Sequence, residues 1–259
     1  MTEQLDNYKK IALEAARIAG GFLAKNYGLK IRAEYNDVTG HCTIDRDREA
    51  DILYKDFLKE RTPEAGFYTE ETKWHGEREL VWVVDAVDGS SNYRMEIPFF
   101  TTQICLLENQ IPVVCVILNP FLKQEYVAVK GRGAYLNGNG ICVNDVSDMG
   151  RSVLIQDKGI AKVDQAAKYL QLLGPHLMTA RMFGGSTGMD LAMIASGKAE
   201  IAINPKANLY DLVPGVLLVR EAGGIVNNLK GRPWTVSDDN LVATNKKLMS
   251  KVLEILQNR

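Results

Sequence analysis

Residues 79–92 have the sequence ELVWVVDAVDGSSN, the stretch from which the fold can best be worked out. Residues 79–84 form a short apolar run, which predicts a buried strand. Asp85 closes this run, and Asp88 follows three residues later on a turn that Gly89 marks. A tight turn aims both carboxylates at one point, and their mutual repulsion makes that arrangement costly unless a cation lies there.

The chemistry of these residues suits a hard cation and an anion. Carboxylate oxygens without clustered His or Cys favour Mg²⁺ over zinc. Gly89, Ser90 and Ser91 offer backbone N–H groups and hydroxyls, and a helix that begins there would direct its N-terminus at a phosphate. An Asx-type turn that closes the strand, with Ser90 or Ser91 capping a helix, is an equally weighted alternative.

Hydrophobic periodicity predicts elements on both sides of this stretch. Helices are expected over 5–27 and 48–61, and strands over 99–107, 111–118 and 125–129, the first two forming a hairpin. A glycine-rich turn is expected over 131–138. Beyond residue 150, strands over 153–156, 200–203 and 241–244 alternate with helices over 165–173, 186–196, 211–222 and 246–257. The pattern predicts a layered α/β (α+β) protein.

Composition excludes several classes of protein. The 259 residues are 46% hydrophobic, and 31 basic against 32 acidic residues give a net charge of −1. A disordered chain is excluded, and nucleic-acid or membrane partners are disfavoured. The four cysteines stand singly, so zinc-ribbon, iron–sulfur and disulfide frameworks lack ligand spacing; Cys105 and Cys115 are expected in the core. A polar N-terminus and short apolar runs predict a soluble, cytoplasmic protein.

Several familiar site motifs do not fit the chain. An EF-hand beginning at Asp85 fails, because Val87 stands at a ligand position and the glycine is misplaced. A P-loop and a G-x-S-x-G nucleophile elbow are absent from the sequence. The chain has only three histidines, His41, His75 and His176, and each is expected to be structural or at the surface.

Three further acidic positions have simple structural interpretations when taken singly. Glu70 and Glu71 resemble a solvated pair at the end of a short apolar stretch. Asp47 lies near the start of a predicted helix, where the helix dipole favours an acid. Asp211 opens another predicted helix, where Asp is a preferred N-cap.

Taken in order, these acids resemble the pattern of the inositol monophosphatase family of Mg²⁺-dependent, lithium-sensitive sugar phosphatases. That pattern is an upstream Asp, then Glu-Glu, then Asp-Pro-x-Asp-Gly-(Thr/Ser), then Trp-Asp ahead of a helix that ends in Glu-Ala-Gly-Gly. The chain has Asp47, Glu70-Glu71, Asp85-Ala-Val-Asp88-Gly-Ser, Tyr-Asp211 and Glu221-Ala-Gly-Gly224. Similar stretches at 131–138, at Gly185-Ser-Thr and at Val-Ala-Thr-Asn extend the resemblance over essentially the whole chain.

The resemblance implies an α-β-α-β-α sandwich that forms one unit over 1–259 and commonly assembles as a homodimer. An α+β half, 1–148, would carry the metal-site motifs, and an α/β half, 149–259, would complete the site. The expected activity is Mg²⁺-dependent hydrolysis of a small polyol phosphate, inositol 1-phosphate first. Fructose 1,6-bisphosphate, a nucleoside 3′,5′-bisphosphate, histidinol phosphate and a non-catalytic regulatory role are the alternatives.

The resemblance also implies roles for individual residues. Two to three Mg²⁺ ions would be bound: one by Glu70, Asp85 and the carbonyl of Val87, another by Asp85, Asp88 and Asp211, and a third, looser ion near Glu70. Asp47 and Ser91, with Glu70, would act on the attacking water. Phosphate and alcohol would be contacted by Asp88, Gly89, Ser90, Ser91, Gly185, Ser186, Thr187, Asn204 and Asp211.

The chain departs from the family pattern at a few positions. Ala86 stands where Pro is usual, and Tyr210 where Trp is usual. Asn204 stands where inositol-specific members usually have an acid that binds substrate hydroxyls. Nearby Lys206 either meets a second phosphate or is a solvated surface lysine.

Overall fold

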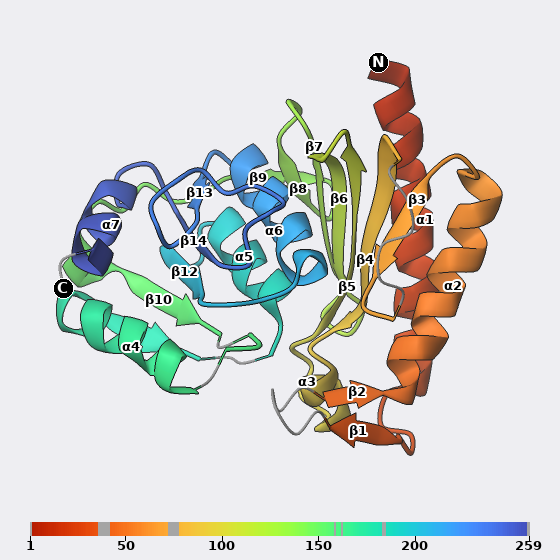
Figure 1. Cartoon of the computed structure of the whole chain (residues 1–259), viewed down its shortest axis with the longest axis horizontal. Helices are drawn as coiled ribbons and strands as arrows, with labels where there is room; N and C mark the ends of the chain where they lie inside the picture. Colours follow the sequence, from red (N-terminus) through yellow and green to blue (C-terminus); the bar gives the residue numbers. More distant parts are fainter. Residues whose placement is uncertain are drawn as a thin grey trace.

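The computed structural model describes residues 2–35, 42–71, 78–157, 159–161, 163–182 and 185–257. Helices and sheets alternate in it (Figure 1). Helices α1 (Thr2–Asn26) and α2 (Asp45–Arg61) cover one face of the larger sheet, α5 (Thr187–Ala195) and α6 (Leu209–Glu221) lie between the two large sheets, and α4 (Val163–Leu173) and α7 (Met249–Gln257) cover the far side. The predicted α-β-α-β-α sandwich is confirmed.

The larger sheet contains the apolar run and the two aspartates of residues 80–88. Its seven described strands run in the order β3-β4-β5-β6-β7-β8-β9, antiparallel except for the β3–β4 pair. Their bounds are Gly66–Thr69, Leu80–Asp88, Thr101–Glu108, Ile111–Asn119, Gln124–Val129, Ala134–Leu136 and Asn139–Ile141. Strand β4 continues past the predicted end at residue 84, because cross-strand pairing with β5 reaches Asp88. Residues 131–138, predicted as a turn only, contain β8.

The second sheet has five described strands in the order β11-β10-β12-β14-β13. Their bounds are Thr179–Arg181, Val153–Gln156, Ile201–Asn204, Leu241–Thr244 and Ile225–Asn227. Short elements complete the described chain: β1 (Ala33–Tyr35), β2 (Cys42–Ile44), α3 (Ser90–Arg94), and the 3₁₀ helices η1 (Met149–Arg151) and η2 (Gly174–His176). The four-residue strands β10, β12 and β14 lie at or near their predicted positions, whereas three-residue strands such as β1 and β13 were not predicted, because they are too short to show periodicity.

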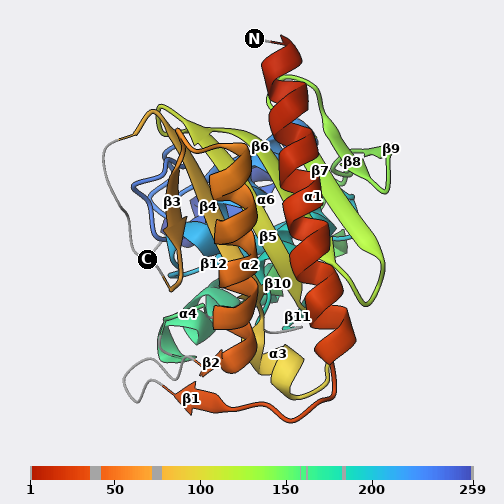
Figure 2. The same ribbon diagram turned by 90° about the vertical axis from the view of Figure 1, so that its right-hand side faces the viewer.

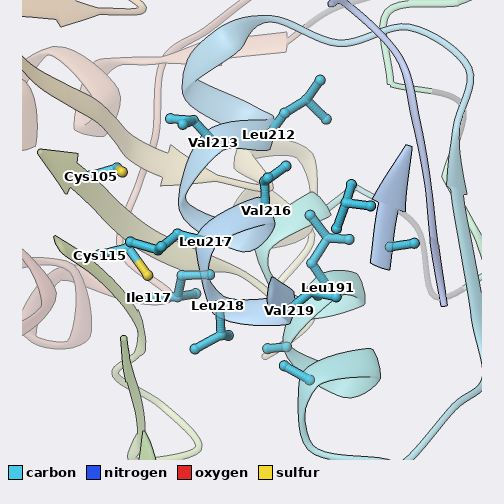
Figure 3. Close-up of a cluster of buried hydrophobic side chains, with 14 of the residues drawn as sticks. Cys105, Cys115, Ile117, Leu191, Leu212, Val213, Val216, Leu217, Leu218 and Val219 are labelled. Carbon is cyan, nitrogen blue, oxygen red and sulfur yellow. The ribbon is translucent and has the colours of Figure 1, made fainter. Parts of the chain in front are cut away.

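Both faces of β4, β5 and β6 are buried, so most of the side chains in the middle of these strands are apolar. Val83, Cys105 and Cys115 face α6 in one cluster, which Figure 3 shows around Val216 and its neighbours. Side chains of the opposite face, among them Trp82, lie beneath α1 and α2 in a second cluster, and Figure 2 shows these two helices side by side across the sheet. The expected core positions of Cys105 and Cys115 are confirmed, since both are fully buried.

Helix α1 is amphipathic, as its sequence predicts. It buries small side chains such as Ala12, Ala16 and Ala19, which lets it pack closely against α2 and β6. None of the helices in the described part of the chain has the length and hydropathy needed to cross a membrane.

Two stretches noted for their family resemblance meet at Glu221, the last residue of α6. Its carboxylate accepts hydrogen bonds from the backbone N–H groups of Gly131 (2.9 Å), Arg132 (3.1 Å) and Gly133 (2.9 Å). The glycine-rich turn after β7 is thus fastened to α6 by charge-assisted hydrogen bonds. This contact gives both stretches a structural role.

Candidate active site

A cavity of about 350 Å³ lies at the end of β4 and extends to α3, α5 and α6. It joins residues that are as far apart in the sequence as Glu70 and Asp211. From the predicted set, it is lined by Glu70, Asp85, Val87, Asp88, Gly89, Ser90, Ser91, Gly185, Thr187 and Asp211. The other described residues that line it are Cys42, Asn92, Met95, Asp157, Gly159, Ile160 and Met182.

The end of β4 and the turn that follows it place Asp85 and Asp88 at the cavity. The β4–β5 register shifts between Asp85 and Asp88, and the Val87 N–H donates to Asp85 Oδ1 at 3.2 Å. The Asx-type contact that was one alternative is therefore present. Gly89 has φ +101°, and a Cβ there would lie 2.6 Å from the Gly185 carbonyl oxygen, so only glycine fits. It is Gly89, rather than a serine, that occupies the N-cap position of α3.

Asp88 is held by four hydrogen bonds. Its Oδ2 accepts from Thr101 Oγ1 (2.8 Å), Ser186 Oγ (2.7 Å) and the Gly188 N–H (2.8 Å), and its Oδ1 accepts from the Thr187 N–H (2.9 Å). The first turn of α5 thus points its N–H groups at this carboxylate, as the helix dipole favours. Ser186 was expected to face the alcohol; it is instead fully buried and supports Asp88.

Asp47 and Asp211 occupy equivalent positions in two different helices. Each is the third residue of its helix, and its Oδ2 accepts the backbone N–H of the residue that precedes the helix: Ile44 (2.6 Å) and Asn208 (2.7 Å) respectively. The expectation that Asp211 is an N-cap is wrong, because Asn208 occupies that position. The capping contact fixes each carboxylate through one oxygen.

Asp47 contacts Ser90, whereas Ser91, expected to act on the attacking water together with Asp47, lines the same cavity. Ser90 Oγ lies 2.8 Å from Asp47 Oδ1, to which it donates, and 2.9 Å from the Val87 carbonyl oxygen. Successive residues of a helix point about 100° apart, so when Ser90 faces Asp47, Ser91 faces elsewhere in the same cavity. The serine that contacts Asp47 is therefore Ser90.

Asn204 does not line the cavity, contrary to expectation. It is buried, its Nδ2 donates to Thr187 Oγ1 at 3.0 Å, and its Oδ1 accepts the Lys206 N–H at 3.1 Å. Both ends of the amide are therefore engaged within the protein. The side chain of Lys206 is exposed, in agreement with its interpretation as a surface lysine.

The segment after β10 lies over Asn204. Ile160 donates its N–H to the carbonyl oxygen of Lys206 at 2.8 Å, and Gly159 approaches so closely that a Cβ would lie 2.7 Å from Asn204 Oδ1. Asp157, Gly159 and Ile160 of this segment line the cavity, whereas Asn204 does not. Met95 and Met182 also line it and are 51% and 60% exposed.

Burial and mutual repulsion raise the pKa values of the acids in the cavity. For Asp85, burial and then the charges of Asp88 and Asp211 raise the pKa well above its ordinary value. Burial, with the charge of Asp88, raises the pKa of Asp211 to about 8. Burial, with Glu71 next, raises that of Glu70 to about 7, and burial raises that of Asp88 to about 6 against the opposing hydrogen bonds. The site therefore favours protons or a cation.

The donor chemistry fits a hard divalent cation, although the ligands are not set around a common point. Within the described ranges, no three His, Cys, Asp or Glu side chains stand in the arrangement of a formed metal site. Burial and the charges of neighbouring acids raise the pKa values of both Asp85 and Asp211. Carboxylate oxygens and the Val87 carbonyl are the ligands that Mg²⁺ prefers, and since a cation binds the ionised carboxylates, its binding competes with protons.

Comparison with known proteins identifies the family. The model of the inositol monophosphatase family matches residues 4–259. The chain belongs to the inositol monophosphatase family. Among its relatives, the Nus factor SuhB of Xylella fastidiosa is 30% identical over 262 residues, covering 95% of this chain and 93% of the relative. The inositol monophosphatase of Mesembryanthemum crystallinum is 27% identical over 260 residues, with 96% of each covered.

The similarity to a solved structure extends to the fold of this chain. The extragenic suppressor protein suhB of Bartonella henselae superimposes with a TM-score of 0.89 at 25% identity, covering 96% of this chain and 98% of that one. Since relatives named as phosphatases and relatives named as a Nus factor are both similar to this chain, family membership leaves its activity to be proposed from the site.

Some predicted residues lie away from the cavity, and some important ones were missed. Glu71 is exposed and pairs with Arg48 at 3.5 Å, and His176 is exposed as expected; His41 and His75 lie outside the described residues. Thr101 and Gln103, which contact Asp88 and the backbone of α6, were not predicted. The signal was there, because polar residues inside a strand predicted to be buried call for a partner.

Proposed function

We propose that this chain is a metal-dependent phosphomonoesterase that hydrolyses a small polyol phosphate, with inositol 1-phosphate as the first expected substrate. The observation that carries the proposal is the gathering of Glu70, Asp85, Asp88 and Asp211 around one cavity, at pKa values that call for a cation. The same cavity is lined by Gly89 and by Ser90 and Ser91, the first residues of α3, which directly follow Asp88 in the chain. Cation ligands and anion-binding N–H groups side by side suit a phosphate ester.

The proposed cation ligands are Glu70, Asp85, the Val87 carbonyl, Asp88 and Asp211, for two to three Mg²⁺ ions. When bound, such ions lower the pKa of a water, neutralise phosphate and stabilise a leaving oxygen. Asp88 is pre-positioned for this role by its four hydrogen bonds. The phosphate oxygens would be held by the N–H groups of Ser90 and Ser91, which lie in the first turn of α3 and so lack intrahelical partners.

Asp47 and Ser90 are the proposed proton acceptors. Burial, and then the charge of Glu70, raises the pKa of Asp47 well above its ordinary value, which makes its carboxylate a stronger base. Ser90 Oγ donates to this carboxylate, so its lone pairs face away from Asp47. A water that gives its proton to Ser90 Oγ allows Ser90 to pass its own proton to Asp47 Oδ1.

A matched pair of serine variants tests this assignment. We expect Ser90→Ala to lower kcat by on the order of 10²-fold, because a proton-transfer group contributes about that much, whereas Ser91→Ala lowers kcat less than about threefold. Phosphate release at saturating substrate measures both. The opposite ranking of the two variants would return the role to Ser91.

The proposed function itself is tested by phosphate release with and without Mg²⁺. The panel contains inositol 1-phosphate, fructose 1,6-bisphosphate, 3′-phosphoadenosine 5′-phosphate and histidinol phosphate. We expect Mg²⁺-dependent release that prefers inositol 1-phosphate over the two bisphosphates, because Asp157 lines the cavity and its carboxylate would accept hydroxyl donors and repel a second phosphate. No release from any of the four compounds would contradict the proposal.

A regulatory role is the second candidate, and the relatives named Nus factor SuhB favour it. Mg²⁺ binding without phosphate release from the panel is the result expected of such a protein. We also propose, from family membership, one structural unit over 1–259, a homodimer, a cytoplasmic location and sensitivity to Li⁺. Light scattering tests the homodimer, and the same phosphate-release assay with added Li⁺ tests the sensitivity to Li⁺.

A further inference from the structure

Helix α6, which carries Asp211, contains a proline in its second turn. Pro214 has no N–H, so the helical hydrogen bond to the carbonyl oxygen four residues earlier, that of Tyr210, is missing. Tyr210 is buried. A buried carbonyl without a donor is costly, and this one is adjacent to the proposed cation ligand.

Gln103 supplies a donor at this point. Its Nε2 donates to the carbonyl oxygens of Tyr210 and Asp211, both at 3.3 Å. Gln103 is fully buried on β5, and in the β4–β5 ladder it stands directly opposite Asp85. One amide group therefore links the strand that holds Asp85 to the helical turn that holds Asp211.

Gly188 makes room for this side chain. A Cβ at Gly188 would lie 2.7 Å from Gln103 Oε1, 2.7 Å from Asp88 Oδ2 and 2.9 Å from Thr101 Oγ1. Gln103 Oε1 is buried without a hydrogen-bond partner in the structure. Burying Gln103 Oε1 without a partner destabilises the folded state, whereas the two hydrogen bonds that Gln103 Nε2 donates to α6 stabilise it.

We propose that Gln103 is a positioning residue for Asp211: it replaces the hydrogen bond that Pro214 removes and so sets the carboxylate for cation binding. The inference rests on the proposed function, in which Asp211 is a cation ligand. Gln103 acts through the backbone of α6 and touches neither substrate nor cation.

A double-mutant cycle with Pro214 tests the proposal, since Pro214→Ala restores the N–H that Gln103 replaces. In the natural background we expect Gln103→Met, similar in length but without a donor, to weaken Mg²⁺ binding about tenfold, as loss of a residue that supports a ligand commonly does. In the Pro214→Ala background we expect the same change to weaken binding less than about threefold. Calorimetric titration with Mg²⁺ alone measures the affinity of each variant for Mg²⁺. Urea unfolding without Mg²⁺ measures the coupling between positions 103 and 214 in the free energy of unfolding.

Equal losses of Mg²⁺ affinity in the two backgrounds would overturn the proposal, because a residue that merely fills space is indifferent to Pro214. Coupling in unfolding without coupling in Mg²⁺ affinity would limit Gln103 to stabilising α6 and also overturn it. If the natural protein binds no Mg²⁺, the proposed function fails together with this inference, whereas normal binding with no coupling refutes the inference alone. Gln103→Leu replaces the Met variant if the latter does not fold.

Discussion

Asp211→Asn is expected to lower Mg²⁺-dependent phosphate release on the order of 10³-fold while leaving the protein folded. The asparagine carbonyl can still accept the Asn208 N–H, which Asp211 Oδ2 accepts at 2.7 Å, so the start of α6 is preserved. What is lost is one negative charge among the proposed cation ligands. Phosphate release and calorimetric Mg²⁺ titration, compared with the natural protein, measure the two effects.

Asp88→Asn makes the same chemical change, from a carboxylate to an amide, at a side chain that accepts more hydrogen bonds than Asp211 does. Asp88 accepts from two hydroxyls and two backbone N–H groups, and an amide NH₂ facing those N–H groups would place donor against donor. We expect this variant to lose stability as well as activity. Full turnover in Asp211→Asn would contradict the assignment of the cation ligands, whatever Asp88→Asn does.

The second large effect is on stability as a function of pH. Without divalent cations, we expect the melting temperature to fall by on the order of 5–10 °C between pH 5 and pH 8. Burial raises the pKa values of Asp88, Glu70 and Asp211 to about 6, 7 and 8, whereas unfolded carboxyls titrate near about 4. The folded chain therefore binds more protons than the unfolded chain in this range, so stability is fully present below about pH 4 and is lost as the pH rises through the folded values.

Mg²⁺ should reverse this trend, because the cation binds the ionised carboxylates and their affinity for it grows with pH. We expect the melting temperature at pH 8 to rise with Mg²⁺ concentration, and to rise much less in Asp211→Asn. Thermal melts in EDTA and in Mg²⁺, at several pH values, make the measurement. A melting temperature that is independent of pH in EDTA would show that the pKa values of Asp88, Glu70 and Asp211 are not raised in the folded protein.

Much of the fold could be predicted because it depends on patterns that are local in the sequence. The helices over 5–27 and 48–61 and the strands of the β5–β6 hairpin were found near their predicted positions, since long amphipathic or apolar runs have one favourable arrangement. The short strands β1, β3, β11 and β13 could not be found in this way. They exist because a neighbouring strand offers hydrogen-bond partners, which a local pattern does not record.

The sequence by itself predicted which acids would form the site, because Asp85 and Asp88 follow a recognisable strand and Asp47, Glu70 and Asp211 follow the order of a known family. Only the tertiary structure decided which side chains meet. It paired Asp47 with Ser90 rather than Ser91, turned Asn204 inward to Thr187, and placed Gln103 beneath the proline of α6. Such choices depend on the direction of each side chain and on the buried polar groups that need a partner, and both arise only when distant elements pack together.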